Sequence, residues 1–566
     1  MAIQLFSIAE TANRNRGRNS QWNQENGKEC FPRIRVSFTN AQFKERLICL
    51  QYINTSLSSH QHAMIEMLAF TPGSALTLAL VAMVTGLLGY WLTNRMKYNY
   101  PPTPGLAIPL IGHTYKISMS NFCKQCLEWT QTYGPVLTLH LGPMKLVVVN
   151  KIDIALEVLV KKSTDFANRM VTPTVRVFTE GGKDIAFSNY TPTWKLHRKM
   201  SSKALRQLMQ GPALEQRIHN AMVTVFAEMD KIVGKPFEPA EYINFAIGNI
   251  LMGLCFGGSF DFEDKEINFI LKAEDELLEN ISNVPEDIYP PLQYLIKSKA
   301  FKRVEDATQT VLAYIKKRYS AELATYKPDA QRHLADHLIL ARQEAKEEED
   351  PEVLASLTET HITQTLADIF FAGIDTSRLT LRFAVLHMIA NPKIQQKVQQ
   401  EIDRVVGPNR LPCLSDRPDL AYTEAVLHES MRLSTVAPTG VFHKTLSDTS
   451  IGEYMLPKGT PVAINHWALH HDPEAWGDVD AFIPERFLDE DGKLGPKPKS
   501  WLPFSAGKRV CLGEFVAKPE LHLLFACLMQ RYTWGMEEGK IPDLAPIASI
   551  FVMYPKEQDV VIKRRF

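Results

Sequence analysis

The sequence has no excess of charge of either sign. Its 63 Lys and Arg residues balance 63 Asp and Glu residues, so no overall charge favours nucleic acid or an acidic partner. Cysteine is scarce, with 8 in 566 residues, which is typical of a chain in a reducing compartment. Internal repeats and low-complexity tracts are also missing. These absences argue against nucleic-acid binding and against a repeat architecture.

A zinc site of four cysteines is equally hard to build from this sequence. Only Cys123 and Cys126 form a CxxC pair, in the run NFCKQCLEWT, and no second pair completes a site. We therefore interpret the pair as part of the surface and core of a helix. What the chain does have is length and a hydrophobic content of 45%, enough for a large globular core and ordinarily for more than one domain.

Charged residues are also missing between Glu66 and Arg95, where residues 75–92 are almost wholly apolar. This run is long enough to cross a bilayer as a helix and too long for the apolar region of a cleaved signal. Trp91 suits the membrane interface, and Arg95 and Lys97 follow at once. The positive-inside rule then places the C-terminal bulk of the chain in the cytosol.

Residues 1–66 are polar, rich in Asn, Gln and Ser, and lack sustained periodicity. They contain Arg14, Arg16, Arg18, Arg33 and Arg35 among other basic residues, and these would have to cross the membrane. Either they form an N-terminal extension, or translation begins at Met64 or Met67. We favour the later start, because Met67 leads directly into the apolar run.

Four segments follow from this pattern: a polar extension at 1–66, a transmembrane anchor at 67–94, a hinge at 95–112 and one large domain at 113–566. The hinge is basic and rich in proline, which stiffens a segment without letting it become helical. Such a hinge would hold the domain at a set angle to the membrane.

The large domain is predicted to be mainly α, with some α+β character. Strand signals occur in PVLTLHLGPMKLVVVN, with a turn at Gly142 and Pro143, and again at 462–465 and 560–563. Helical periodicity dominates elsewhere, and one helix is expected to run from about 351 to 390.

The run FSAGKRVCLG contains Phe504, Gly507, Arg509, Cys511 and Gly513. Glycine permits positive φ and close backbone approach, so it suits a loop that displays a thiolate. A helix beginning just after the cysteine would point its positive end at the sulfur, and the arginine brings a cation suited to a carboxylate. A planar dianionic cofactor ligated through iron, such as haem, would use all of these groups. The alternative is a buried structural cysteine beside a glycine turn.

This run resembles the haem-ligand signature of the cytochrome P-450 superfamily at every fixed position. The resemblance implies haem b (iron protoporphyrin IX), with Cys511 as the axial ligand of the iron. It implies that Arg509 contacts a haem propionate and that Phe504, Gly507 and Gly513 shape the loop around the cofactor.

The middle of the expected helix at 351–390 carries Ala372, Gly373, Asp375 and Thr376. Glycine inside a helix costs on the order of 1 kcal/mol, so its presence suggests that something needs the space. Thr376 can bond back to the carbonyl of Ala372 and bend the helix, and Asp375 adds a carboxylate for moving protons. The alternative is an ordinary helix with one packed glycine. The run is similar to the oxygen-activation motif of the superfamily, which implies monooxygenation with Asp375 and Thr376 as the catalytic pair.

Glu429 and Arg432 lie three residues apart on a predicted helix, which alone indicates a surface pair worth about 0.2–0.5 kcal/mol. Arg486 in PERF stands where the superfamily completes a buried Glu-Arg-Arg network. The resemblance assigns these three residues to the integrity of the fold and the haem pocket.

Further propionate contacts are implied by the same resemblance. Trp194 and Arg198 in TWKLHRK match a WxxxR helix, and Arg169 and His443 match in FANR and VFHK. Arg169 could instead be a solvated loop arginine.

Basic residues recur along the WxxxR helix at Lys195, Arg198, Lys199 and Lys203. A solvated helix face is the usual explanation. The resemblance instead implies a docking site for NADPH–cytochrome P-450 reductase, through which NADPH supplies electrons, with cytochrome b5 as a second candidate partner.

Within the superfamily, the stretches VAPTGVFHKT, SIGEYMLPKGTPVAINHWALHHDPEAW and PERFL resemble animal microsomal enzymes, most of all the vertebrate steroid 17α-hydroxylase/17,20-lyase family. Drug-type and aryl-hydrocarbon-type hydroxylases are the next most similar. The residues assigned to the substrate pocket are Ala372, Gly373, Asp368, Asn280, Val436, Ala437, Ile550 and Phe551. Two features depart from the steroid family: Asp375 stands in place of glutamate, and the loop 170–182 differs.

The expected protein is thus a haem-thiolate monooxygenase of the endoplasmic reticulum membrane that acts on a lipophilic small molecule, with a steroid favoured. Hydroxylation of xenobiotic, aromatic or fatty-acid substrates is the alternative. Two alternatives come from other functional classes: a haem sensor, and a non-oxidative isomerase or lyase.

Overall fold

The computed structural model describes residues 81–86, 89, 97–209, 213–281, 284–348 and 351–566. The chain divides into two compact units, Met1–Thr93 and Asn94–Phe566. In the first unit, residues 81–86 and 89 are helical, and the Thr85 hydroxyl donates to the carbonyl of Val81 at 2.7 Å. The predicted extension at 1–66 and most of the predicted anchor at 67–94 lie outside the described residues. Within the described ranges, no helix combines the length and apolarity that crossing a membrane requires.

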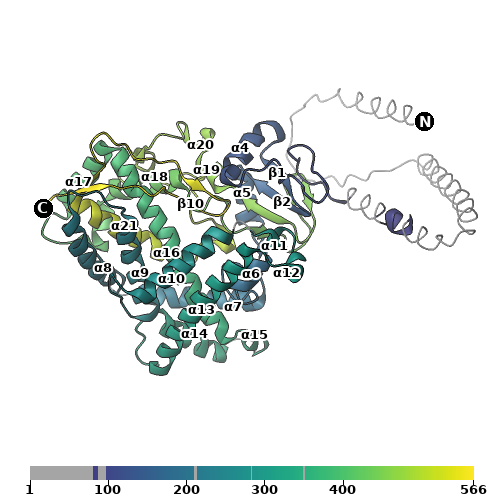
Figure 1. Ribbon diagram of the computed structural model, residues 1–566, viewed down its shortest axis with the longest axis horizontal. Helices are drawn as coiled ribbons and strands as arrows, with labels where there is room; N and C mark the ends of the chain where they lie inside the picture. Colours follow the sequence, from purple (N-terminus) through teal and green to yellow (C-terminus); the bar gives the residue numbers. More distant parts are fainter. Residues whose placement is uncertain (1–80, 87–88, 90–96, 210–212, 282–283, 349–350) are drawn as a thin grey trace, which may run out of the picture. The chain divides into compact units, whose positions relative to one another are not determined.

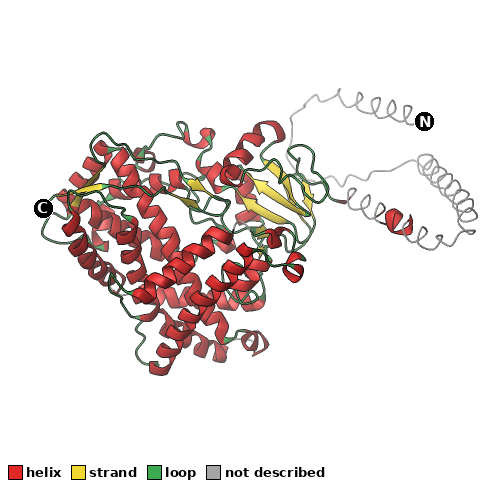
Figure 2. Cartoon of the chain, in the orientation of Figure 1, coloured by secondary structure: helices red, strands yellow, loops and turns green. Residues whose placement is uncertain are grey.

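The second unit is dominated by helices (Figure 2), as predicted. Its α-helices are α4 (Phe122–Tyr133), α5 (Ile152–Leu156), α6 (Pro173–Phe178), α7 (Pro192–Met209), α8 (Ala213–Met229), α9 (Ala240–Phe256), α10 (Lys265–Ile281), α11 (Pro285–Ile288), α12 (Leu292–Leu295), α13 (Lys299–Thr325), α14 (Leu334–Glu348), α15 (Pro351–Ser356), α16 (Glu359–Ala390), α17 (Pro392–Val405), α18 (Ala421–Ser434), α19 (His466–His470), α20 (Pro473–Trp476) and α21 (Glu514–Arg531).

The strands form one five-stranded sheet and three two-stranded sheets. They are β1 (Val136–Leu141), β2 (Met144–Val149), β3 (Asn168–Arg169), β4 (His443–Lys444), β5 (Thr449–Ile451), β6 (Tyr454–Leu456), β7 (Pro461–Ile464), β8 (Tyr532–Gly535), β9 (Ile547–Ala548), β10 (Met553–Tyr554) and β11 (Val561–Arg564). The large sheet has the order β1-β2-β7-β4-β3. Figure 1 shows this sheet at one side of the unit, next to α4.

The predicted strands are confirmed. β1 and β2 pair antiparallel across the Gly142–Pro143 turn, with Val136 opposite Val149. β7 and β11 occupy the two later strand signals. β2 pairs with β7 in parallel, which joins segments about 300 residues apart in the chain. The CxxC cysteines are also placed as predicted, because Cys123 and Cys126 are both buried on α4.

One long helix was predicted over 351–390, and this prediction is wrong in one respect. The segment forms two helices, α15 and α16, that are separated by Leu357 and Thr358. The backbone N–H of Thr358 donates to Nδ1 of His361 at 3.0 Å. This contact caps the first turn of α16, so a new helix begins here.

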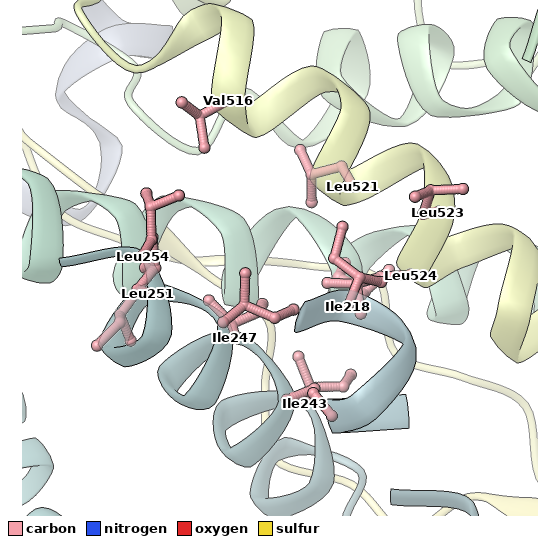
Figure 3. Packing of buried hydrophobic residues seen from close by; sticks show 14 of the residues in the cluster. Ile218, Ile243, Ile247, Leu251, Leu254, Val516, Leu521, Leu523 and Leu524 are labelled. Carbon is pink, nitrogen blue, oxygen red and sulfur yellow. The ribbon is translucent and has the colours of Figure 1, made fainter. Parts of the chain in front are cut away.

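The main hydrophobic core lies between α8, α9, α16 and α21. Figure 3 shows Ile247 of α9 close to Ile218 of α8, with Leu524 of α21 next to Ile218. Most of α16 is buried, although it is 32 residues long. A helix surrounded in this way is fixed in position, so side chains in its middle can form a precise site.

The proline-rich segment lies along β1. Thr138 donates through its backbone N–H to the carbonyl of Pro102 and through its hydroxyl to the carbonyl of Pro101, each at 2.8 Å. Because proline has no N–H group, Pro101 and Pro102 contribute acceptors only. Lys97 forms an ion pair with Asp448 at 2.8 Å.

Candidate active site

Cys511 lies in a loop whose geometry presents its side chain. Its backbone N–H donates to the carbonyl of Phe504 at 3.0 Å, and α21 begins three residues later at Glu514. Burial raises the pKa of the Cys511 thiol, whereas the backbone N–H groups of Gly513 and Glu514 and the charge of Arg198 lower it. The predicted helix start after the cysteine is therefore present, and its N–H groups are directed at the sulfur.

Gly507 is required where the loop packs against the rest of the protein. It has φ of +72°, and a Cβ atom at this position would lie 1.7 Å from the carbonyl oxygen of Leu159. A Cβ at Gly513, in contrast, would have no atom within 4 Å. The first glycine allows close backbone contact, and the second leaves space beside Cys511.

Arg509 is buried and held by backbone carbonyls. Its guanidinium donates to the carbonyl oxygens of Ala167 at 2.7 Å, Ile185 at 3.2 Å and Ser188 at 2.6 Å. It also lies over the Trp194 ring, 3.8 Å from its centroid. These contacts fix the orientation of the arginine.

The other proposed propionate contacts gather around Arg509. Arg169 and His443 are opposite each other in β3 and β4, so Arg169 is not a solvated loop arginine. Arg169 donates to Val441 O at 2.6 Å, and Arg198 on α7 donates to Val510 O at 2.6 Å. Segments far apart in sequence thus place their cations beside the Cys511 loop.

This cluster of cations lacks sufficient negative charge. Burial, followed by the positive charge of Arg169, lowers the pKa of Arg509 to about 8, with Asp184 acting in the opposite direction. Burial also lowers the pKa of Arg169 to about 9. His443 is kept neutral, because burial and Arg169 hold its pKa well below the usual value. A dianionic group beside these residues would supply the missing charge, so the residues fit the two propionates of a haem.

The middle of α16 has an exposed face. Ala372 and Thr376 are exposed, whereas the neighbouring Ile374, Asp375 and Ser377 are buried. The Thr376 hydroxyl donates to the carbonyl of Ala372 at 2.7 Å, which confirms the predicted back-bond. An exposed hydroxyl within a mostly buried helix is accessible to a small ligand.

Gly373 has a different role from the one inferred from the sequence. A Cβ atom there would lie 2.9 Å from Cδ1 of Leu251, a buried core residue of α9. The missing side chain therefore makes room for the packing of α9 against α16, and the interpretation that it leaves space for a ligand needs correction.

Asp375 is buried and paired. Its Oδ1 atom lies 2.7 Å from Nη2 of Arg378, one helical turn away on α16. Burial raises the pKa of Asp375 to about 6, and the charge of Arg378 opposes this shift. Asp375 can therefore change its protonation state near neutral pH.

Glu429, Arg432 and Arg486 form one ion-paired network. Nε of Arg432 lies 2.7 Å from Oε2 of Glu429, and Nε of Arg486 lies 3.3 Å from Oε1. The side chains of Glu429 and Arg432 are completely buried. Arg432 also donates to the carbonyls of His470 and Val479, so the network joins α18 to the segment before the cysteine loop.

The residues assigned to the substrate pocket fall in three places. The carboxylate of Asp368 accepts from the backbone N–H of Ile185 at 2.7 Å, which holds the turn whose carbonyl contacts Trp194 and Arg509. Asn280 donates to the carbonyl of Glu276 on its own helix, α10.

Val436, Ala437, Ile550 and Phe551 come from two segments that lie side by side. The backbone N–H of Met553 donates to Val436 O at 2.9 Å. All four are buried or half-buried.

Sequence reasoning missed Arg378 and Glu274, which surround Asp375. Arg378 stands three residues after Asp375, a spacing that indicates one helix face. Glu274 on α10 has no local signal in the sequence, because only tertiary packing brings it to Asp375.

Comparison with known proteins identifies the family of the chain. A family model described as "Cytochrome P450" matches residues 101–562. The steroid 17-alpha-hydroxylase/17,20 lyase of Squalus acanthias is 33% identical over 498 residues, covering 87% of this chain and 97% of the relative. Cytochrome P450 2U1 of Mus musculus is 31% identical, covering 87% and 96%.

A solved structure of a zebra fish cytochrome P450 with progesterone has a TM-score of 0.71 and 31% sequence identity. It covers 78% of this chain and 99% of that chain. The chain therefore belongs to the cytochrome P450 family, whose members are haem-containing oxidoreductases that incorporate oxygen from O2 into their substrates.

Proposed function

We propose that the protein is a membrane-bound haem-thiolate monooxygenase that inserts one oxygen atom from O2 into a C–H bond of a steroid. The single observation that carries the monooxygenase assignment is that Cys511, just before α21, and Thr376, within the mostly buried α16, are both exposed. The steroid preference is supported by the similarity to 17-alpha-hydroxylases and to the progesterone-containing zebra fish structure.

In this proposal Cys511 would bind the haem iron, and Arg169, Arg198, Arg509, Trp194 and His443 would hold the propionates. The haem, when bound, would supply the oxygen chemistry. The chain orients the cofactor through the buried arginines. The backbone N–H groups at the start of α21 stabilise the thiolate.

Thr376 and Asp375 bind and transfer protons in the proposed site. The Thr376 hydroxyl is exposed on α16, and because its proton is donated to the carbonyl of Ala372, its oxygen can accept a hydrogen bond from a bound ligand. Asp375 lies behind it, and its pKa of about 6 suits the release and uptake of a proton near neutral pH. In this proposal the two residues carry protons from the buried side of α16 to its exposed side.

Electrons would come from NADPH through NADPH–cytochrome P-450 reductase, with cytochrome b5 as an alternative donor. Lys195 and Lys508 are exposed and share contacts with the Tyr190 ring, at 4.8 and 5.6 Å. Lys199 is exposed on the same helix as Lys195. This basic surface adjoins the Cys511 loop and suits an acidic partner.

Attachment to the endoplasmic reticulum membrane is supported by two exposed apolar segments. Leu106 and Leu110 are each 78% exposed, and Tyr294, Leu295 and Ile296 are also largely exposed. The hydroxyl of Tyr289, close to the second segment, donates to Leu110 O at 2.6 Å. The two segments together form an apolar surface of the kind that inserts into lipid, in addition to the predicted anchor at 67–94.

The decisive experiment uses the full chain purified with haem. We expect a thiolate-type carbonyl absorbance on reduction, a spin-state shift with progesterone, and a hydroxylated product that requires O2, NADPH and reductase. Cys511→Ser should lose the thiolate-type absorbance, whereas Cys413→Ser should keep it.

Fatty acids and planar aromatic compounds are tested in parallel. If only these shift the spin state and are hydroxylated, the steroid assignment is wrong but monooxygenation stands. Product formed without a reductant would indicate an isomerase or lyase. Haem binding without any product would indicate a sensor.

A further inference from the structure

The buried carboxyl group of Glu274 on α10 has no hydrogen-bond donor among the described residues. It is 2% exposed, and neither of its carboxylate oxygens receives a hydrogen bond from any described residue. It interacts with the Asp375 carboxyl on α16, and the two helices are joined at this point because Arg378, 2.7 Å from Asp375, also pairs with Asp275, the residue after Glu274. Two carboxylates have acceptors only, so such a contact is unfavourable unless a proton lies between them.

The charges around this pair are unbalanced. The groups that face it from the elements packed here are Asp275 and Glu279 of α10, Arg378 and Arg382 of α16, and Tyr554 of β10. Arg378 contacts both Asp375 and Asp275. Arg382 lies 3.2 Å from Glu238, so its charge is shared with another carboxylate. Arg378 alone cannot neutralise Glu274, Asp375 and Asp275 together.

We propose that Glu274 and Asp375 share one proton, with Glu274 donating a hydrogen bond to the Asp375 carboxylate. During turnover, this proton is the one that is delivered toward Thr376 on α16. Glu274 is a positioning residue, because it acts through Asp375. When the proton moves, an O–H bond breaks at Glu274 and one forms at Asp375, which then releases a proton toward Thr376. A hydronium ion from solvent then protonates Glu274 again and leaves neutral water. The supply role rests on the proposed function, whereas the shared proton is a property of the resting protein.

The ionisation behaviour agrees with this assignment. Burial, followed by the charge of Asp375, raises the pKa of Glu274 well above its usual value, whereas Asp375 is raised only to about 6. Glu274 therefore keeps the proton when Asp375 is ionised. Because the folded-state pKa of Glu274 is raised, its contribution to stability is complete below the usual glutamate pKa and is lost as the pH rises through the raised value.

Infrared spectroscopy of the resting holoenzyme tests the shared proton without turnover. We expect the difference spectrum of wild type against Glu274→Gln to contain the carbonyl stretch of a protonated carboxylic acid, shifted in D2O. Glu276→Gln, on the exposed side of the same helix, is the matched control and should leave the band unchanged. Absence of the band from the wild-type difference spectrum would overturn the proposal. If Glu274→Gln loses haem, Glu274→Asp replaces it and should move the band.

Turnover then tests the supply role. We expect Glu274→Gln to release several-fold more peroxide per NADPH than wild type and to flatten the dependence of coupling on pH, with Glu276→Gln unchanged. Thr376→Ala is measured alongside. If Thr376→Ala uncouples and Glu274→Gln does not, the supply role of Glu274 is refuted and the proposed function stands. If neither variant uncouples, the proposed proton path through Thr376 is itself refuted, while the infrared band still reports on the pair.

Discussion

The α-carbon of Gly507 lies so close to the backbone of Leu159 that an added Cβ atom would come within 1.7 Å of the Leu159 carbonyl oxygen. Leu159 belongs to the π-helical turn Glu157–Lys161, whose backbone is held by its own hydrogen bonds. The loop that carries Cys511 is therefore seated on this turn, and the contact leaves no room for any side chain.

Gly507→Ala should destabilise the protein by at least ~2 kcal/mol, because the overlap involves backbone and the residue also has positive φ. Thermal unfolding and haem retention are the measurements. Gly535→Ala is the control, since no atom lies within 4 Å of its added Cβ, and it should change stability by less than ~1 kcal/mol. Equal stability of the two variants would contradict the proposed seating.

Glu429→Ala should cost about 3–5 kcal/mol, because it leaves the buried charge of Arg432 without its partner. We expect little folded, haem-containing protein, measured by absorbance per polypeptide after purification. Glu485→Gln provides the contrast: Glu485 is half-exposed, pairs with Lys397 at 3.0 Å, and should cost less than ~1 kcal/mol. A Glu429 variant as stable as the Glu485 variant would show that the buried network contributes nothing measurable.

Thr376→Ala should keep haem and substrate binding but release more of its reducing equivalents as peroxide, since it removes the exposed hydroxyl. Loss of a positioned proton donor typically costs about 10²–10⁴-fold in the step that it serves. Thr380→Ala is the matched control, because Thr380 makes the same kind of back-bond, to Thr376 O at 2.7 Å, but is buried. The ratio of peroxide to product distinguishes them, and equal ratios would argue against a role for Thr376.

Lys195→Glu combined with Lys199→Glu should slow reduction by the reductase at low salt, with a smaller difference at high salt, because screening removes electrostatic steering. Stopped-flow reduction under carbon monoxide is the measurement. The double variant Lys265→Glu/Lys272→Glu, which changes exposed lysines of α10, makes the same change in net charge and should reduce at the wild-type rate. Similar slowing in both variants would place the docking site elsewhere.

Much of the site could be predicted because its members are close together in the chain. The Cys511 loop and the start of α21 occupy one short run, and Thr376 bonds to a carbonyl four residues earlier. Trp194 and Arg198 share one helix. Such features depend on local backbone geometry, which a few consecutive residues already specify.

Other features of the fold and site could not be predicted from local sequence, as three residues illustrate. Gly373 was interpreted as space for a ligand, yet its neighbour is Leu251 of another helix. Asp368 was assigned to the substrate pocket, and it binds the backbone of Ile185. Thr358 caps the start of a new helix, α16, at a point where periodicity alone predicted one continuous helix. In each case the partner comes from packing or from a side-chain cap that periodicity does not record.

The amino-acid sequence was sufficient for the family, the cysteine loop and the mainly helical architecture, because each depends on short-range patterns of residue type. The meeting of Glu274 with Asp375, the gathering of three arginines beside Cys511 and the fit of Gly507 on Leu159 required the folded chain. These contacts join segments that are distant in sequence, and only the burial of a common core brings them within a few ångströms.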